Sequence, residues 1–187
     1  NLPSSAWDDS MAIVDGYSVH VKSTVSPGWD YGLSMSGTAR MTSDGSINLN
    51  GINPAKISIS GGSFDAAGEF TLTRPIRVTA NVTAGSMTLG GEAGFQITGN
   101  MVSKGAVSIA TSAIVNGSVS GTQVTTGSSV KISGSLNATG AVSIGSSSSV
   151  GAGVTGASIT ADSSVKIGGS LTSAGRVTIG SSSSVGS

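Results

Sequence analysis

Residues 121–151 read GTQVTTGSSVKISGSLNATGAVSIGSSSSVG, and residues 156–186 read GASITADSSVKIGGSLTSAGRVTIGSSSSVG. The second stretch repeats the first 35 positions later, and the apolar residues of the two stretches superpose one for one. Self-similarity at a fixed period is typical of repeat proteins, in which each repeat buries its apolar side chains against its neighbours. This repeat decides the fold class before any single motif is considered.

A shorter period lies inside the repeat and produces three columns of apolar residues, in which steps of 17 and 18 positions alternate. The first column is Ile97, Val115, Ile132, Val150, Ile167 and Val185; the second is Met101, Val119, Leu136, Val154 and Leu171; the third is Leu89, Val107, Val124, Val142, Ile159 and Val177. Three columns that advance together predict a three-sided coil, with one side chain from each side in a common core. We expect the residues of these columns from Ile97 to Val185 to form that core, and neighbouring coils to pair as parallel strands about 4.8 Å apart.

The local sequence agrees with short strands joined by tight turns. Apolar and polar residues alternate within each side, as where Lys131 separates Val130 from Ile132, and the middle residue is predicted to point outward. Glycine and serine separate the sides, and glycine adopts the turn conformations of a narrow coil without steric cost. Charged residues make up only 10% of the chain, against about 25% in an average protein, which disfavours amphipathic helices.

We therefore predict an all-β fold, a three-sided parallel β-solenoid (β-helix) with about 17–18 residues per coil. The solenoid is placed at residues 31–187, with the 35-residue double-coil repeat clearest at 86–187, which gives about nine coils and a length of about 43 Å. Residues 1–30 differ from it, because they contain Trp7, Trp29 and the only histidine, His20. We interpret them as an N-terminal capping or attachment segment, since the terminal repeats of solenoids are atypical.

Composition disfavours several classes of function. The formal net charge is zero and the densest basic pair is Arg74 and Arg77, so we expect no nucleic-acid partner. No apolar run approaches the length that a membrane-spanning helix needs, which predicts that none is present. The chain has no cysteine and begins at Asn1, which is consistent either with removal of a signal peptide or with trimming of a longer sequence.

Two glycine motifs invite a ligand-binding interpretation, and we reject both. Gly151, Gly153 and Gly156 match the G-x-G-x-x-G pattern of dinucleotide sites, which requires a following helix, but residues 157–160 are predicted to be a strand. Asp65 follows a Gly-Gly pair, as in calcium-binding β-rolls, yet later coils lack an equivalent aspartate. We expect no cofactor and no metal.

The sequence also offers few residues that could form a catalytic site. A Ser–His–Asp triad would need His20, and paired carboxylates would come from Asp65, Glu69, Glu92 or the N-terminal acids. Because the regular half of the chain has almost no acids, we predict no catalytic residue and no enzyme activity.

An outward ladder of hydroxyl side chains climbs one predicted face. Its members are Ser108, Thr125, Ser143, Thr160 and Thr178. Ladders of this kind can indicate ice binding, but the neighbouring outward positions are irregular and partly charged. The favoured interpretation is a stacked, solvated face.

The alternation at 130–145 and 165–180 resembles two groups of proteins. One is the bactofilins, bacterial proteins whose three-sided β-helices stack into filaments; the other is the bacterial surface and pilus-associated proteins with β-solenoid stalks, including filamentous-haemagglutinin-like adhesins. The chain is less charged than bactofilins and has an N-terminal segment that they lack, which favours the second group. The resemblance implies a non-enzymatic structural or adhesive protein at the bacterial cell surface or outside the cell. An ice- or carbohydrate-binding module is the alternative.

The last coil leads to an expectation about partners. It contains Ile167, Leu171, Val177 and Val185, and it carries neither a proline nor a run of charge that would blunt a strand edge. We expect this end to associate with more solenoid, either by end-to-end self-association or as the continuation of a longer chain. Surface glycans or other cells are the further partners that the adhesin resemblance implies.

Overall fold

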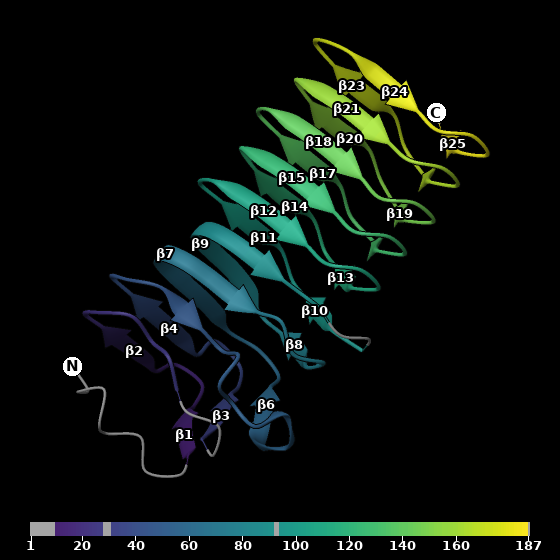
Figure 1. Ribbon diagram of the computed structural model, residues 1–187. Coiled ribbons are helices and arrows are strands. Elements are labelled where there is room, and N and C mark those ends of the chain that lie inside the picture. The colour runs from purple at the N-terminus through teal and green to yellow at the C-terminus, as the bar shows by residue number, and fades with distance from the viewer. Residues whose placement is uncertain (1–9, 28–30, 92–93, 187) are drawn as a thin grey trace.

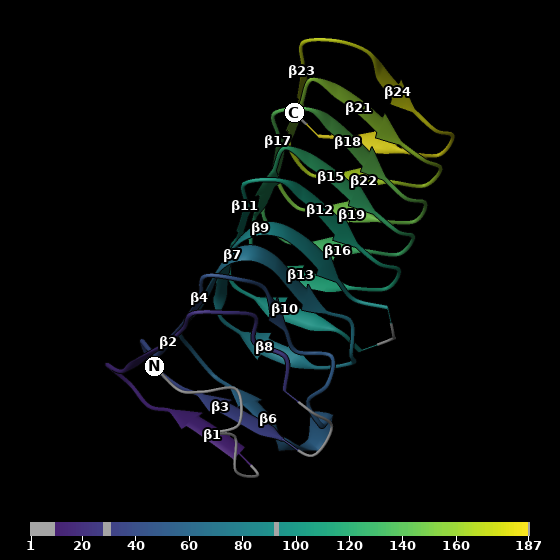
Figure 2. The same cartoon turned by 60° about the vertical axis from the view of Figure 1, so that its left-hand side comes forward.

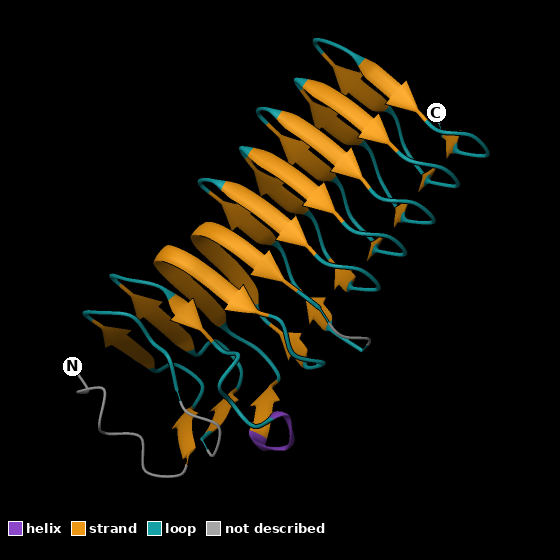
Figure 3. Cartoon of the chain, viewed as in Figure 1, coloured by secondary structure: helices purple, strands orange, loops and turns teal. Residues whose placement is uncertain are grey.

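The computed structural model describes residues 10–27, 31–91 and 94–186 and confirms the all-β solenoid. Its coils stack along one axis from the N-terminal to the C-terminal end (Figure 1). Strands and short loops make up nearly all of it (Figure 3), apart from one turn of 3-10 helix, η1 (Pro54–Lys56). Parallel pairing links every coil to the next, which is the architecture that the sequence predicts.

The first side of the solenoid is one parallel sheet of ten strands, so the chain completes about nine turns. Figure 2 shows many of these strands lying one above another. In order they are β1 (Ser10–Ile13), β3 (Gly32–Met35), β6 (Ile57–Ile59), β8 (Arg77–Thr79), β10 (Gln96–Thr98), β13 (Ile114–Asn116), β16 (Lys131–Ile132), β19 (Ser149–Val150), β22 (Lys166–Ile167) and β25 (Ser184–Val185).

The second and third sides belong to one 15-stranded sheet, because two long strands run through the corner between them. These are β7 (Ser63–Leu72) and β9 (Asn81–Leu89). The second side also contains β2 (Ser18–Val21), β4 (Arg40–Ser43), β11 (Met101–Ser103), β14 (Val119–Gly121), β17 (Leu136–Ala138), β20 (Val154–Gly156) and β23 (Leu171–Ser173). The third side contains β5 (Ile47–Asn48), β12 (Ala106–Ile109), β15 (Gln123–Thr126), β18 (Ala141–Ile144), β21 (Ser158–Ala161) and β24 (Val177–Ile179).

The pairing register follows the predicted columns, with one correction. Ile97 pairs with Val115 on the first side, and Met101 pairs with Val119 on the second. On the third side Val107 pairs with Met87, whereas Leu89 pairs with Ile109. The placement of Leu89 in the third column is therefore wrong, and Met87 takes its place. Both residues point inward on the same strand, so the alternation alone could not choose between them.

The solenoid begins earlier than residue 31. Strand β1 pairs in parallel with β3, and β2 pairs in parallel with β4, so residues 10–21 already follow the coil path. The sequence hides this coil because the steps from Met11 to its partner Leu33, and from Leu33 to Ile57, are longer than those of the regular half. Longer turns at the corners change the period without breaking the strand register. Trp7 and Trp29 lie outside the described residues.

One continuous apolar core fills the solenoid from Ile13 to Ile167. Phe64 and Phe70 are fully buried, and their ring centroids lie 5.3 Å apart where β7 turns the corner between the second and third sides. In the regular half, the core consists mainly of valine and isoleucine, with alanine at Ala113, Ala138 and Ala161. Thirteen of the predicted core residues are buried: Ile97, Met101, Val107, Val115, Val119, Val124, Ile132, Leu136, Val142, Val150, Val154, Ile159 and Ile167.

The other three predicted core residues, Leu171, Val177 and Val185, are partly or largely exposed. They occupy inward positions of the last described coil, and burial in a solenoid requires a coil on both sides. These side chains point inward like their equivalents, and they are exposed because no described coil lies above them.

The core predicts unequal effects of inward and outward substitutions. Leu136 is fully buried, so Leu136→Asp would place an unpaired carboxylate between coils and should destabilise the fold by several kcal/mol. Ser143→Ala removes an exposed hydroxyl and should change stability by less than about 0.5 kcal/mol. Urea unfolding of both variants measures the difference, and equal midpoints would contradict the inside–outside assignment.

Candidate functional site

The corner between the third and first sides is built from a column of serines with left-handed backbone. Their φ angles are +62° at Ser112, +59° at Ser129, +59° at Ser147, +62° at Ser164 and +58° at Ser182. Non-glycine residues adopt this conformation at an energetic cost. Backbone hydrogen bonds between coils stabilise it here, as where the Ser129 N–H donates to the Ser146 carbonyl at 2.8 Å and the Ser147 N–H donates to the Ser163 carbonyl at 3.0 Å.

The residue after each left-handed serine points inward and explains why the repeat spans two coils. After Ser112 it is Ala113, and in the four coils that follow it alternates between valine (Val130, Val165) and serine (Ser148, Ser183). The buried Ser148 hydroxyl accepts a hydrogen bond from the Val130 N–H at 3.1 Å and donates to the Gly127 carbonyl at 3.2 Å. Ser183 makes the equivalent pair of bonds in the next repeat. The serine thus satisfies backbone groups of the coil below it, a role that sequence reasoning missed because both residues lie inside a run of four serines.

The outward hydroxyl ladder lies on the third side and is longer than the sequence indicates. Its five predicted members, Ser108, Thr125, Ser143, Thr160 and Thr178, are exposed and paired in register. The register adds Thr88 below Ser108, and Thr71 below Thr88. An alignment of Leu89 with Val107 leaves Thr71 and Thr88 out of the ladder. The observed pairing of Met87 with Val107 brings both into it.

The residues that flank the ladder differ from rung to rung. Alanine or glycine lies two positions away along several rungs, at Ala106, Ala141, Gly127 and Gly145. Gln123, Asp162 and Arg176 interrupt this pattern on the two flanks. The regular array is therefore one residue wide.

Two acidic residues and the histidine considered for catalysis contact residues of neighbouring coils. Asp65 accepts a hydrogen bond from the Arg40 guanidinium at 2.5 Å, and Glu69 accepts one from the Thr88 hydroxyl at 2.6 Å. His20 contacts Thr42 at 2.8 Å through Nδ1 and Asp44 at 3.3 Å through Nε2. Glu92 lies outside the described residues. Each described contact joins residues of successive coils, as cross-strand polar pairs do in sheets.

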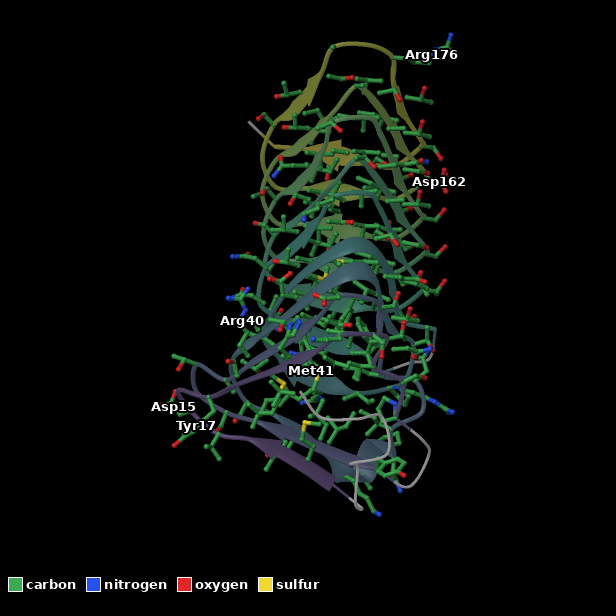
Figure 4. The ribbon with its side chains drawn as sticks, turned by 90° about the vertical axis from the view of Figure 1, so that its left-hand side faces the viewer. Asp15, Tyr17, Arg40, Met41, Asp162 and Arg176 are labelled. Carbon is green, nitrogen blue, oxygen red and sulfur yellow. The ribbon has the colours of Figure 1, made fainter. Side chains whose placement is uncertain are left out.

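A carboxylate at the N-terminal end also links two coils. Asp15 accepts hydrogen bonds from the side-chain hydroxyl and the backbone N–H of Thr38, both at 2.7 Å. These bonds favour the ionised form and lower the pKa of Asp15. Figure 4 shows Asp15 and Tyr17 at this end of the rod and Arg176 at the other.

The G-x-G-x-x-G motif is confirmed as a strand and corner element. Gly151 and Gly153 precede β20, Gly156 ends it, and the strand β21 follows in place of a helix. A Cβ on Gly151 would collide with the Ser133 carbonyl oxygen, and one on Gly156 would lie 2.9 Å from a Val142 methyl group. Close approach of the neighbouring backbone thus favours glycine at position 151, whereas a side chain at position 156 would require Val142 to shift.

Two observations on residues 10–27, 31–91 and 94–186 bear on ligand binding. No three His, Asp and Glu side chains of these residues gather as a metal site would require. A hollow of about 150 Å³ beside β8 and β10 is lined by uncharged residues, including Asn81 and Gly99. That volume is below the roughly 300–1,000 Å³ of typical ligand pockets. The search for apolar helices long enough to span a membrane finds none in residues 10–27, 31–91 and 94–186.

Comparison with known protein families, curated proteins and solved structures gives no match. The fold places the chain among parallel β-solenoids, an architecture that bactofilins and adhesin stalks share in general. Membership of either group stays a prediction.

The buried Ser148 predicts a stability effect from a single hydroxyl. Ser148→Ala leaves the Val130 N–H without its acceptor, and an unsatisfied buried donor costs about 1–3 kcal/mol. Ser143→Ala removes a solvated hydroxyl and serves as the matched control. Comparable urea midpoints for the two variants would show that the Ser148 bonds contribute nothing.

The left-handed corner predicts a contrast between two substitutions at Ser147. Glycine adopts φ of +59° freely, while a β-branched side chain is strained there. We expect Ser147→Val to be less stable than Ser147→Gly by at least about 1 kcal/mol. Thermal unfolding measures the difference, and a valine variant as stable as the glycine variant would refute the backbone assignment.

Proposed function

We propose that the chain is a non-enzymatic structural or adhesive protein that acts as a rigid extracellular stalk at a bacterial surface. The observation that carries the proposal is the unbroken coil-to-coil pairing from β1 to β25 around one apolar core. Ten first-side strands at about 4.8 Å spacing span about 43 Å. A rod of this kind supplies length and display.

The distribution of polar groups supports a structural role. The acids that a hydrolase would need form contacts between coils, as with Asp65 and Arg40 or Glu69 and Thr88. The surface of the regular half consists mainly of Ser, Thr and Gly, which suits a rod exposed to water. Attachment to surface glycans or other cells, and association through the ends, belong to the same proposal.

An ice- or carbohydrate-binding module is the second candidate, and the hydroxyl ladder is the feature that favours it. Seven rungs from Thr71 to Thr178 are aligned by strand register. Against it stand the ladder's single-residue width and the charged flanking positions Asp162 and Arg176. We rank it below the stalk for this reason.

Substitution of the ladder distinguishes the two candidates. Thr125→Arg interrupts the third-side ladder, and Asn137→Arg introduces the same charge on the second side as a control; both positions are exposed. For a stalk, we expect both variants to keep the rod dimensions measured by small-angle X-ray scattering. We also expect no thermal hysteresis in the unmodified protein or in either variant.

Hysteresis or glycan-array binding that Thr125→Arg abolishes and Asn137→Arg preserves would favour the binding module instead. A compact scattering profile for the unmodified protein would contradict the stalk directly.

A further inference from the structure

We propose that the first side of the solenoid binds an extended acidic polysaccharide that carries one anionic group per disaccharide. The inference rests on the proposed role as a surface stalk, and it adds the chemical class of the surface glycan and the side of the rod that contacts it. Three exposed cations carry the inference: Arg77 on β8, Lys131 on β16 and Lys166 on β22.

Charge is segregated by side in the described part of the chain. The ten first-side strands contain Arg77, Lys131 and Lys166 and no acidic residue. The described acidic residues lie at corners or on the other two sides; they are Asp15, Asp44, Asp65, Glu69 and Asp162. A polyanion that lies along the first-side strands therefore meets cations and no carboxylate of those strands.

Strand register places the three cations in one column along the rod. Arg77 lies three coils below Lys131 in this column. Lys131 pairs with Ser149, which pairs with Lys166 in the following coil. Figure 2 shows the strands concerned, β8, β16 and β22, on the same side of the rod. The two lysines are therefore about 10 Å apart along the axis, which is close to the length of one disaccharide in an extended polysaccharide.

The three cations are available to a ligand. Within the described residues, no hydrogen bond or ion pair engages the side chains of Arg77, Lys131 and Lys166, whereas the Arg40 guanidinium on the second side is bound to Asp65. A single exposed ion pair contributes little. Affinity would therefore come from several contacts along one polymer, each of which raises the effective concentration of the next anion.

A second outward column beside the cations offers groups that can bind sugar hydroxyls. Thr79, Thr98 and Asn116 are aligned by register, each two positions after the cation column. Their hydroxyl and amide groups can donate and accept hydrogen bonds. Further along the rod this column consists of glycine, at Gly151 and Gly168, so that no side chain there separates a bound polymer from the backbone beside Lys166.

The density of charge favours a polysaccharide over a nucleic acid. Double-stranded DNA carries one charge per about 1.7 Å of its axis, whereas the regular half of the column has one lysine per about 10 Å. The first-side strands also contain no aromatic residue on which a base could stack. A polymer with one carboxylate per disaccharide matches the spacing of the lysines.

The test measures binding of a fluorescently labelled hyaluronan oligosaccharide, which has one carboxylate per disaccharide, by fluorescence anisotropy at low ionic strength. K131Q/K166Q neutralises both lysines of the column. K104Q/R176Q is the matched control, because it removes the same charge from exposed residues outside the first-side strands. K166Q/S149K keeps the net charge but places the two cations on adjacent coils.

We expect K131Q/K166Q to lose affinity by at least about tenfold, K166Q/S149K to lose affinity as well, and K104Q/R176Q to stay within about threefold of the unmodified protein. Added salt should weaken the binding, because the contacts are exposed. Absence of binding by the unmodified protein, or equal losses in the two glutamine variants, would overturn the proposal. Equal affinity for a neutral chito-oligosaccharide, or tighter binding of a DNA duplex, would overturn it too.

The outcome is separable from that of the stalk proposal. Thr125→Arg lies on the third side and should keep the binding; its loss there would assign the glycan to the hydroxyl ladder and overturn the first-side assignment. The rod dimensions measured by scattering do not depend on a bound glycan, so they judge the stalk independently.

Discussion

Parallel pairing of each coil with the next, in a fixed register, is the constraint on which the rest of the structure depends. Because paired residues sit about 4.8 Å apart along the axis, each inward side chain must fit the one directly above and below it. Ile97, Val115 and Ile132 illustrate the result, a column of β-branched residues on one side. The same constraint stacks the outward residues, so the hydroxyl ladder is a by-product of register.

The backbone has little room at the corners of narrow coils, and three features of the sequence allow it to turn there. Glycine allows carbonyl groups of the neighbouring coil to approach, as at Gly151. Left-handed serines turn the chain while their N–H groups bond to the next coil. Ser148 and Ser183 place a hydroxyl at an inward position, and that hydroxyl forms hydrogen bonds with backbone groups of the preceding coil.

The solenoid differs between its two ends. Near the N-terminal end, coils are longer and carry the contacts of Asp15, His20 and Arg40 with the coil above. Near the C-terminal end, charge is sparse and the last coil exposes apolar residues that its equivalents bury.

The sequence by itself determined the three-sided parallel solenoid, because three apolar columns that advance at one short period, with glycine and serine corners, admit few other folds. It also placed Leu136 and Val142 inward and Thr125 and Ser143 outward, since alternation within a strand sets the face. Tertiary structure alone decided the start of the first coil, the rungs at Thr71 and Thr88, the bonds of Ser148, and the exposure of Val177. The first three depend on which residues are paired between neighbouring coils, and the lengths of the corners, which the period does not reveal, set that pairing. The exposure of Val177 depends instead on its place in the last described coil.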